Sequence, residues 1–260
     1  MRFLKAFLKR ILPERLQERL RRKRPLHPGA MESFSQEGED RILSGIFHGQ
    51  AEGFYVDVGA HHPTELSNTY VFYRKGWRGI NIDPLAGIMV MFDQVRPRDI
   101  NVEVAISDTD DMLTYYEFNT PVINTFSREL SQQRMEYGDG PKSDFRFELL
   151  AERKVATRRL ADVLGEHMPA GQRIDFLSID VEGHEMEVLR SNDWSSYHPV
   201  IVLIEDASLL SLDEMDRSPI VAFMRERGYV PFCRTPLTLI FVDKSELVTT
   251  PLGPRLRSIA

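Results

Sequence analysis

Apart from the residues of a packed core, the sequence has few features that stabilise or anchor a protein. Its 260 residues include a single cysteine, Cys233, so no internal disulfide can form and nothing requires an oxidising compartment. Cys233 lies in a strand-like stretch and is expected to be a buried apolar side chain. No run of about 18 uncharged apolar residues occurs, which argues against a membrane-spanning helix. These absences favour a cytoplasmic protein.

Positive charge is scarce except at the beginning of the chain. Residues 1–24 contain ten basic and two acidic side chains, a net charge of +8, whereas the other 236 residues carry a net charge of −14. A body this acidic argues against nucleic-acid binding, which needs a basic surface to neutralise phosphates. The first residues also lack the unbroken apolar stretch of a secretory signal peptide.

The same basic segment has an apolar stripe at helical spacing, which Pro13 is expected to interrupt. The stripe consists of Phe3, Leu4, Phe7, Leu8, Ile11 and Leu12. Such a helix suits peripheral contact with the inner face of an anionic membrane. Packing on the folded domain, packing on a second copy in a homo-oligomer, and disorder are the alternatives. We expect residues 1–30 to form this segment and a linker, 31–248 the folded domain, and 249–260 a tail.

Strand patterns alternate with helical patterns beyond the linker. Core strands are expected over 53–60, 77–83, 100–106, 174–180 and 200–204, and helices over 70–75, 85–95, 159–168, 185–190 and 218–227. Two more strands, 229–233 and an antiparallel 237–242, follow. This alternation predicts an α/β fold of the Rossmann-like, doubly wound type with a mostly parallel sheet.

Residues 112–156 are the least regular part of the sequence. Strands are expected over 112–118 and 153–157, and the polar stretch between them is expected to contain a turn or loop at 138–141.

Acidic residues follow each expected core strand. In chain order the strands end in Asp57, Asp83, Asp108, the pair Asp180 and Glu182, and the pair Glu205 and Asp206. Because ligands of doubly wound sheets bind beyond the carboxyl ends of the strands, these acids predict one site.

The turn after the first strand favours a cationic nucleoside over a dinucleotide. Gly59 lets a ligand approach the backbone, and Asp57 suits a positive charge. The run 59–63 lacks the second and third glycines of a dinucleotide loop, which disfavours a nicotinamide dehydrogenase. Asp83 can accept both hydroxyls of a ribose, and Asp108 could meet an adenine amino group. Helix capping and ordinary turn formation are the alternatives for these acids.

The run from Asp180 to Glu185 (D-V-E-G-H-E) is the most specific local feature. Clustered carboxylates repel one another, so a purely structural role is disfavoured, although a solvated acidic turn that begins a helix is the alternative. Asp180, Glu205 and Asp206 would meet if the fourth and fifth strands are neighbours, and three oxygen ligands could hold Mg²⁺. Helix capping or general-base action without a metal are the other possibilities.

Five blocks occur in a fixed order within residues 33–243. They are 35–40 (SQEGED), 55–60 (YVDVGA), 67–73 (SNTYVFY), 76–84 (GWRGINIDP) and 179–185 (IDVEGHE). Together they resemble the FkbM family of methyltransferases, within the class I S-adenosylmethionine-dependent fold. The resemblance implies a seven-stranded sheet with an antiparallel last strand, S-adenosylmethionine bound over the first four strand ends, and O-methylation of a small-molecule or glycan acceptor, such as a sugar or natural product.

The candidate residues form three sets, of which the resemblance, carried over by position, implies the first; it also places Asp180 and Glu182 where cofactor and acceptor would meet. The cofactor-binding set is Gln36, Asp57, Gly59, Ala60, Asn68, Asp83, Pro84, Ser107, Asp108 and Asp180. The catalytic set is Asp180, Glu182 and His184, with His184 or Asp180 as the general base. The metal set is Asp180, Glu205 and Asp206. The usual glycine of the first turn is replaced around Pro63, which leaves the contacts of His61 and His62 open. Both histidines also compete with His184 for the role of general base. Residues 119–150 lie outside the dependable match and suit acceptor recognition.

Two other functions remain compatible with these residues. One is a non-catalytic S-adenosylmethionine-binding module tethered to a membrane by its N-terminal segment. The other is a methyltransferase that acts on a protein or a small amine. Catalysis on a hydroxyl mainly requires alignment, which can supply roughly 7–11 kcal/mol, and a base contributes on the order of 10²–10⁴ in rate.

Overall fold

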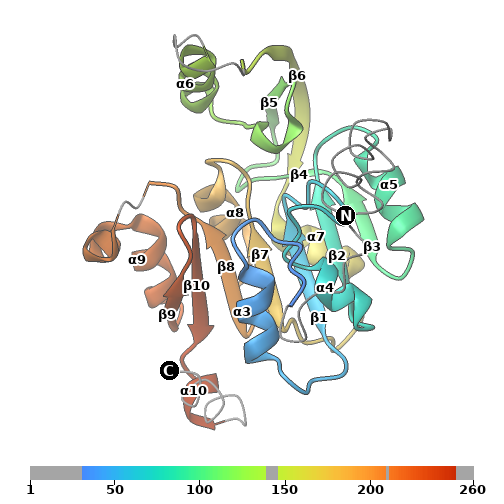
Figure 1. Ribbon diagram of the computed structural model, residues 1–260, viewed down its shortest axis with the longest axis vertical. Helices are drawn as coiled ribbons and strands as arrows, with labels where there is room; N and C mark the ends of the chain where they lie inside the picture. The colour runs from blue at the N-terminus through green and yellow to red at the C-terminus, as the bar shows by residue number, and fades with distance from the viewer. Residues whose placement is uncertain (1–30, 139–145, 209–210, 250–260) are drawn as a thin grey trace, which may run out of the picture. The chain divides into compact units, whose positions relative to one another are not determined.

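Seven strands form the central sheet of the computed structural model, in the order β3-β2-β1-β7-β8-β10-β9 (Figure 1). The structure describes residues 31–138, 146–208 and 211–249. Five neighbouring strands are parallel: β3 (Ile100–Glu103), β2 (Arg78–Asp83), β1 (Phe54–Val58), β7 (Phe176–Ile179) and β8 (Ile201–Glu205). β10 (Thr238–Asp243) is antiparallel to both β8 and β9 (Tyr229–Arg234). The predicted doubly wound sheet with an antiparallel last strand is confirmed.

Helices cover both faces of this sheet. On one face α3 (Glu39–Ile46) and α4 (Tyr70–Arg74) pack against a cluster that includes Tyr55 and Phe176. On the other face lie α7 (Leu160–His167), α8 (Glu185–Ser191) and α9 (Pro219–Glu226), whose apolar residues pack on Val56 and Leu177. Neighbouring residues of β1 and β7 thus serve opposite faces, because side chains alternate along a strand. Burial on both faces explains the almost wholly apolar strand sequences.

The strand order reverses beside β1, which pairs with β2 on one side and β7 on the other. The register places Val58 opposite both Ile82 and Ile179. Gly59, Asp83 and Asp180 therefore leave the sheet at the same edge. In doubly wound sheets this reversal point is where ligands bind.

The expected strand over 100–106 is two strands in two sheets, so that prediction is wrong in its extent. β3 ends at Glu103, and β4 (Ala105–Ile106) pairs in parallel with β6 (Leu149–Arg158) in a second sheet of order β4-β6-β5. β3 is an edge strand with no partner beyond it in the described sheet, so the chain is free to leave it. β5 (Met112–Phe118) has its predicted bounds and pairs antiparallel with β6.

The stretch between β5 and β6 contains helical structure that was not predicted. A short 3₁₀ turn, η1 (Pro121–Ile123), precedes α6 (Arg128–Gly138). α6 lies above the carboxyl edge of the main sheet together with β5 and β6 (Figure 1). The polar sequence of α6 gives little amphipathic pattern, which is why it resembled a loop. Most of the turn expected over 138–141 lies outside the described residues.

Shorter elements complete the fold. α5 (Ile88–Val95) packs beside β3, η2 (Leu212–Arg217) precedes α9, and α10 (Glu246–Thr249) follows β10. Cys233 in β9 is half-buried, whereas full burial was expected. None of the helices in the described ranges has the length and apolar content needed to cross a bilayer. The chain divides into units Met1–Glu32 and Ser33–Ala260; the N-terminal stripe, its linker and nearly all of the predicted tail lie outside the described residues.

Candidate active site at the strand ends

A pocket opens at the carboxyl ends of β1, β2 and β7. Of the predicted cofactor-binding residues, Gly59, Asp83, Pro84 and Asp180 line it. The predicted catalytic residues Glu182 and His184 line it as well, as does the competing candidate His61. β5, η1 and the segment after them form its cover, chiefly through Tyr115, Val122, Asn124 and Phe126. Strand ends and the small second sheet therefore enclose one cavity.

Gly59 permits the close packing on which this cavity depends. Its φ of 82° lies in the left-handed region, and a Cβ there would overlap the main-chain carbonyl of Asp180. The Gly59 amide donates to the Ile82 carbonyl at 2.9 Å, so the turn is bonded to β2 as well. Any other residue would push the β1 turn away from β7.

Asp83 is held as a fixed acceptor on the pocket wall. Its two carboxylate oxygens accept hydrogen bonds from the amides of His61 and Leu85, each at 2.9 Å. Burial raises the pKa of Asp83 to about 6. Because each carboxylate oxygen can accept more than one hydrogen bond, the group can still receive two hydroxyls from a ligand. The structure thus fits a ribose at this position.

Asp57 and Asn68 do not line the pocket, although both were predicted to bind the cofactor. Asp57 is 6% exposed and accepts a hydrogen bond from Thr69 Oγ1 at 2.8 Å. Burial raises its pKa, and the hydrogen bond from Thr69 opposes that rise. The amide nitrogen of Asn68 donates to Ser178 Oγ at 3.1 Å. Both residues are therefore bonded to other parts of the protein and are not on the pocket wall.

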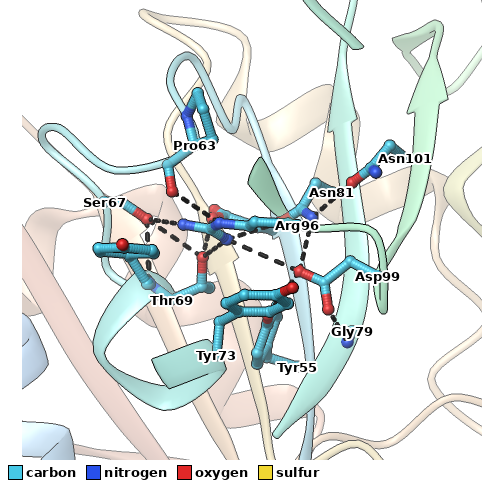
Figure 2. A network of polar contacts seen from close by, with 12 residues as sticks. Tyr55, Pro63, Ser67, Thr69, Tyr73, Gly79, Asn81, Arg96, Asp99 and Asn101 are labelled. Carbon is cyan, nitrogen blue, oxygen red and sulfur yellow. Dashed lines mark hydrogen bonds and ion pairs between the residues drawn. The ribbon is translucent and has the colours of Figure 1, made fainter. Parts of the chain in front are cut away.

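A fully buried arginine, Arg96, secures the segment from Pro63 to Thr69 (Figure 2). Its Nε donates to the Pro63 carbonyl at 2.6 Å and its Nη2 to Ser67 Oγ at 2.7 Å. Its Nη1 donates to Thr69 Oγ1 at 2.8 Å and to Asn81 Oδ1 at 3.2 Å. All three guanidinium nitrogens are therefore used in holding one segment against β2.

Asp99 supplies the negative charge nearest to this guanidinium, 3.9 Å from Arg96 Nη1. It also accepts from the hydroxyl of Tyr55 at 2.6 Å, from the Gly79 amide at 3.0 Å and from Asn81 Nδ2 at 3.0 Å. Figure 2 shows Arg96 between this acceptor set and the Pro63–Thr69 segment. Sequence reasoning missed Arg96, because fully buried arginines are rare and nothing in the local sequence distinguishes this one.

Three carboxyl groups meet beyond β7 and β8. Oxygen atoms of Asp180, Glu182 and Glu205 lie within 4.8 Å of one another. Burial, together with the charges of Glu205 and Glu182, raises the pKa of Asp180 well above its usual range. Burial likewise raises the pKa of Glu205 to about 7. Carboxyl groups this close share protons rather than ionise together, so the cluster can accept or release a proton near neutral pH.

Glu182 joins this cluster to the small second sheet. Its φ of 55° is left-handed, an unfavourable conformation for a residue with a side chain. Thr125 Oγ1 donates to its carbonyl at 2.7 Å, and Arg134 of α6 pairs with its carboxylate. Arg134 also donates to the Ile123 carbonyl. The strained turn is thus held by residues from the stretch that was expected to be loop.

Asp206 is not part of the carboxyl cluster, although it was predicted to complete a metal set. Its carboxylate accepts from Ser208 Oγ at 2.5 Å and from Ser218 Oγ at 2.8 Å. Ser218 is the N-cap of α9, so Asp206 fixes the start of that helix. β7 and β8 are neighbours as expected, but Glu182 stands with Asp180 and Glu205 in its place.

His184 lies on the β4 side of the pocket. Its Nε2 is 3.1 Å from Ser107 Oγ, and its ring centroid is 5.5 Å from that of Phe126. Burial lowers the pKa of His184, although the charges of Glu187 and Asp108 oppose the shift. Asp108 lies nearby, 3.8 Å from Arg190, and like Ser107 does not line the pocket. His184 therefore accompanies the residues predicted to lie near adenine.

The remaining predicted residues do not line the pocket. Ala60 is buried in the core and donates its amide to the Ile82 carbonyl at 3.1 Å. Gln36 is exposed and does not line the pocket, and the nearby Glu37 binds Thr235 Oγ1 at 2.7 Å. His62 Nδ1 accepts from the amides of Thr64 and Glu65, a turn-capping role. The 35–40 block thus ties the chain to the β9–β10 hairpin.

Comparison with known proteins agrees with this geometry. The family model of the methyltransferase FkbM domain matches residues 57–231. The chain belongs to this family. Methyltransferase sdnD from Sordaria araneosa is 30% identical over 129 residues, which are 45% of this chain and 48% of that protein. The chain thus matches about half the length of this curated relative. The family match contains every one of the strands from β2 to β8 and ends within β9.

Proposed function

We propose that this FkbM-family protein is an S-adenosylmethionine-dependent O-methyltransferase that acts on a hydroxyl group of a sugar, glycan or natural product. One observation carries the proposal: the fixed Asp83 carboxylate and Asp180, whose pKa is raised by burial and by the neighbouring Glu205, line one cavity at the point where the strand order reverses. A ribose acceptor and a proton acceptor are the two groups that such an enzyme needs.

The residues of the pocket fit the cofactor. Asp83 would accept the ribose hydroxyls, and apolar side chains that include Val104, Ile106 and Phe126 would pack against a planar base. When bound, S-adenosylmethionine supplies a methyl group already activated by a positive sulfur. The acidic wall formed by Asp180 and Glu182 favours that positive charge. The protein's own contribution is therefore chiefly alignment and proton removal.

We assign proton removal to the pair of Asp180 and Glu205. When the acceptor oxygen takes the methyl group from a bound cofactor, the hydroxyl proton would pass to this carboxyl pair. His184 is the second candidate for this role, but its bond to Ser107 keeps it on the far side of the pocket. Raised pKa values near neutral pH are what a general base requires.

A divalent cation held by Asp180, Glu182 and Glu205 is the second way to activate the hydroxyl. The oxygen ligands and their close approach suit Mg²⁺. Arg134 already pairs with Glu182 and would compete with the ion. Turnover measured with a chelator and then with added Mg²⁺ separates the two mechanisms: unchanged turnover supports the carboxyl pair, and loss followed by recovery supports the metal.

Calorimetry with S-adenosylhomocysteine tests the cofactor assignment. We expect the wild-type protein to bind it and Asp83→Ala to weaken binding about a hundredfold or more, because two hydrogen bonds to a charged group are lost. Asp93→Ala, an exposed acid on α5, is the matched control and should bind normally. Equal affinity in all three proteins would exclude Asp83 as the ribose acceptor.

Formation of S-adenosylhomocysteine during turnover separates the enzyme from a non-catalytic binding module. A hydroxylated acceptor should support that turnover and an amine of the same skeleton should not. Turnover with the amine alone would favour the rival function, methylation of a protein or small amine.

A further inference from the structure

A second cavity, of about 420 Å³, lies next to the cofactor pocket. It is bounded by α6, by the turn that begins α8, by the end of β8 and by the beginning of α9. Apolar side chains form much of its wall: Leu130, Met186, Pro219 and Ile220. Gln133 of α6 and Ser208 after β8 lie at its margin and are exposed. The cavity is thus accessible and has apolar surface against which a ring can pack.

The carboxyl cluster forms the boundary between the two cavities. Glu182 lines both of them, Asp180 lines the first, and Glu205 lines the second. A molecule in the second cavity therefore reaches the proposed proton acceptor from the side opposite to Asp83. Transfer of a group requires its donor and acceptor on either side of one point, and the two cavities provide that arrangement.

The charge of the second cavity restricts what it can bind. Four carboxyl side chains line it: Glu182, Glu185, Glu205 and Asp206. Among the described lining residues Arg134 is the one cation, and it is already bonded to Glu182 and to the Ile123 carbonyl. An anionic ligand would meet these carboxyl groups without a free positive partner, whereas hydroxyl groups could donate to them.

We propose that this second cavity binds the methyl acceptor, and that it selects a hydroxylated molecule without carboxylate or phosphate, seated with an apolar face on Leu130 and Ile220. The inference rests on the proposed function, because the first pocket must hold the methyl donor for the second to hold the acceptor. It adds the location of the acceptor and its charge. Neutral polyol rings have this combination of an apolar face and donor hydroxyls.

Two probes with the same ring test the charge selection. Methyl β-D-glucopyranoside is neutral, and methyl β-D-glucuronopyranoside carries a carboxylate. Their binding to the protein saturated with S-adenosylhomocysteine is measured by saturation-transfer NMR. We expect the neutral glycoside to bind at least about tenfold more tightly, because like charges in an interface cost several kcal/mol. Equal binding of the two probes, or no binding of the neutral one, overturns the inference.

Neighbouring positions on α6 test the location. Gln133 lines the cavity, and Gln132 is exposed on the same helix without lining it. Gln133→Trp should weaken binding of the neutral glycoside at least about tenfold and Gln132→Trp should not, since adjacent residues of a helix point in different directions. Gln133→Lys should improve binding of the glucuronoside, and Gln132→Lys should leave it unchanged. Equal effects of the substitutions at Gln133 and Gln132 on glycoside binding would overturn the placement of the acceptor in this cavity.

The order of measurement separates this inference from the proposed function. Binding of S-adenosylhomocysteine to the wild-type protein is measured first, without any glycoside. If the wild-type protein does not bind S-adenosylhomocysteine, the proposed function and this inference are both overturned. If it binds S-adenosylhomocysteine but the glycoside experiments fail, the proposed function stands and only the assignment of the second cavity is overturned.

Discussion

Two groups of charged side chains lie near the same strand ends, and they differ in how their charges are compensated. Around Arg96, burial raises the pKa values of Asp57 and Asp99, while hydrogen bonds and the guanidinium oppose the rise. Around Asp180, burial also raises the pKa, but there the neighbouring Glu205 and Glu182 add to the rise. One group contains its own counter-ion, and the other places like charges together.

This difference distinguishes a structural group, around Arg96, from a candidate catalytic group, around Asp180. Every guanidinium nitrogen of Arg96 donates to an acceptor, and the group fixes the Pro63–Thr69 segment against β2. The Asp180 cluster has Arg134 at one edge only, and it lies between the two cavities. Like charges this close cost stability, and clusters with raised pKa values of this kind are commonest at functional sites.

The largest expected effect is on turnover. Asp180→Asn should lower the rate on the order of 10²–10⁴-fold, because it removes one member of the proposed base. Its free energy of unfolding should stay the same or rise, since a repelling charge is lost. Steady-state kinetics and chemical denaturation measure the two quantities. A normal rate, or a large loss of stability, would place Asp180 with the supporting residues instead.

The opposite result is expected at Arg96. Arg96→Met should lower the free energy of unfolding by about 3–5 kcal/mol, because it leaves buried carboxylates without their counter-ion. Arg98→Met is the matched control: Arg98 is exposed and donates one hydrogen bond, to the Tyr73 carbonyl at 2.6 Å. Its loss should cost about 1 kcal/mol. Similar losses in the two variants would show that the Arg96 group has no special importance.

The pH dependence of the Asp180 cluster should have opposite signs for activity and for stability. The unfolded chain releases the Glu205 proton near its ordinary pKa of about 4.3, whereas the folded protein holds it until about pH 7. Stability should therefore fall as pH rises through this window, while kcat/KM should rise about tenfold per unit towards pH 7 as the base forms. Glu205→Gln should flatten both profiles. Parallel profiles would contradict the assignment.

The smallest effect is expected at Thr69, which joins Asp57 to Arg96. Thr69→Val keeps the shape of the side chain but removes its hydroxyl, which donates to Asp57 and accepts from Arg96. We expect a loss of about 1–3 kcal/mol in the free energy of unfolding, since buried polar groups lose a partner. Thr64→Val, in the same segment, is the control. Equal melting of the two variants would make the hydroxyl dispensable.

The main sheet was predictable because its strands are apolar runs that end in acids. Asp83 and Asp180 follow such strands, and the parallel order brings both to one pocket. The pocket cover was not predictable. The chain leaves β3 to form β4 only because a partner, β6, lies about fifty residues further along the sequence. Such long-range pairing has no local sequence pattern.

Individual side chains of the site divide in the same way. Glu182 was predicted from its own turn, whereas Arg134 comes from a polar helix that resembled a loop. Asp206 is the opposite case. It follows β8 as expected, but its carboxylate accepts a hydrogen bond from Ser218, the N-cap of α9. Position along a strand predicts which edge a residue reaches, and the direction of its side chain depends on neighbours that only the folded chain supplies.

The second sheet has a consequence for how members of this family could diverge. Its central strand β6 pairs with β5 between Leu149 and Ala156, and with β4 at Thr157 and Arg158. The chain between β5 and β6 thus starts and returns at one place, and among its described residues Thr125 and Arg134 bond to Glu182 in the acidic turn. The insert contributes Val122 and Phe126 to the cover of the first pocket and Thr125 and Arg134 to the support of the Glu182 turn, so its replacement would alter the pocket and the carboxyl cluster together.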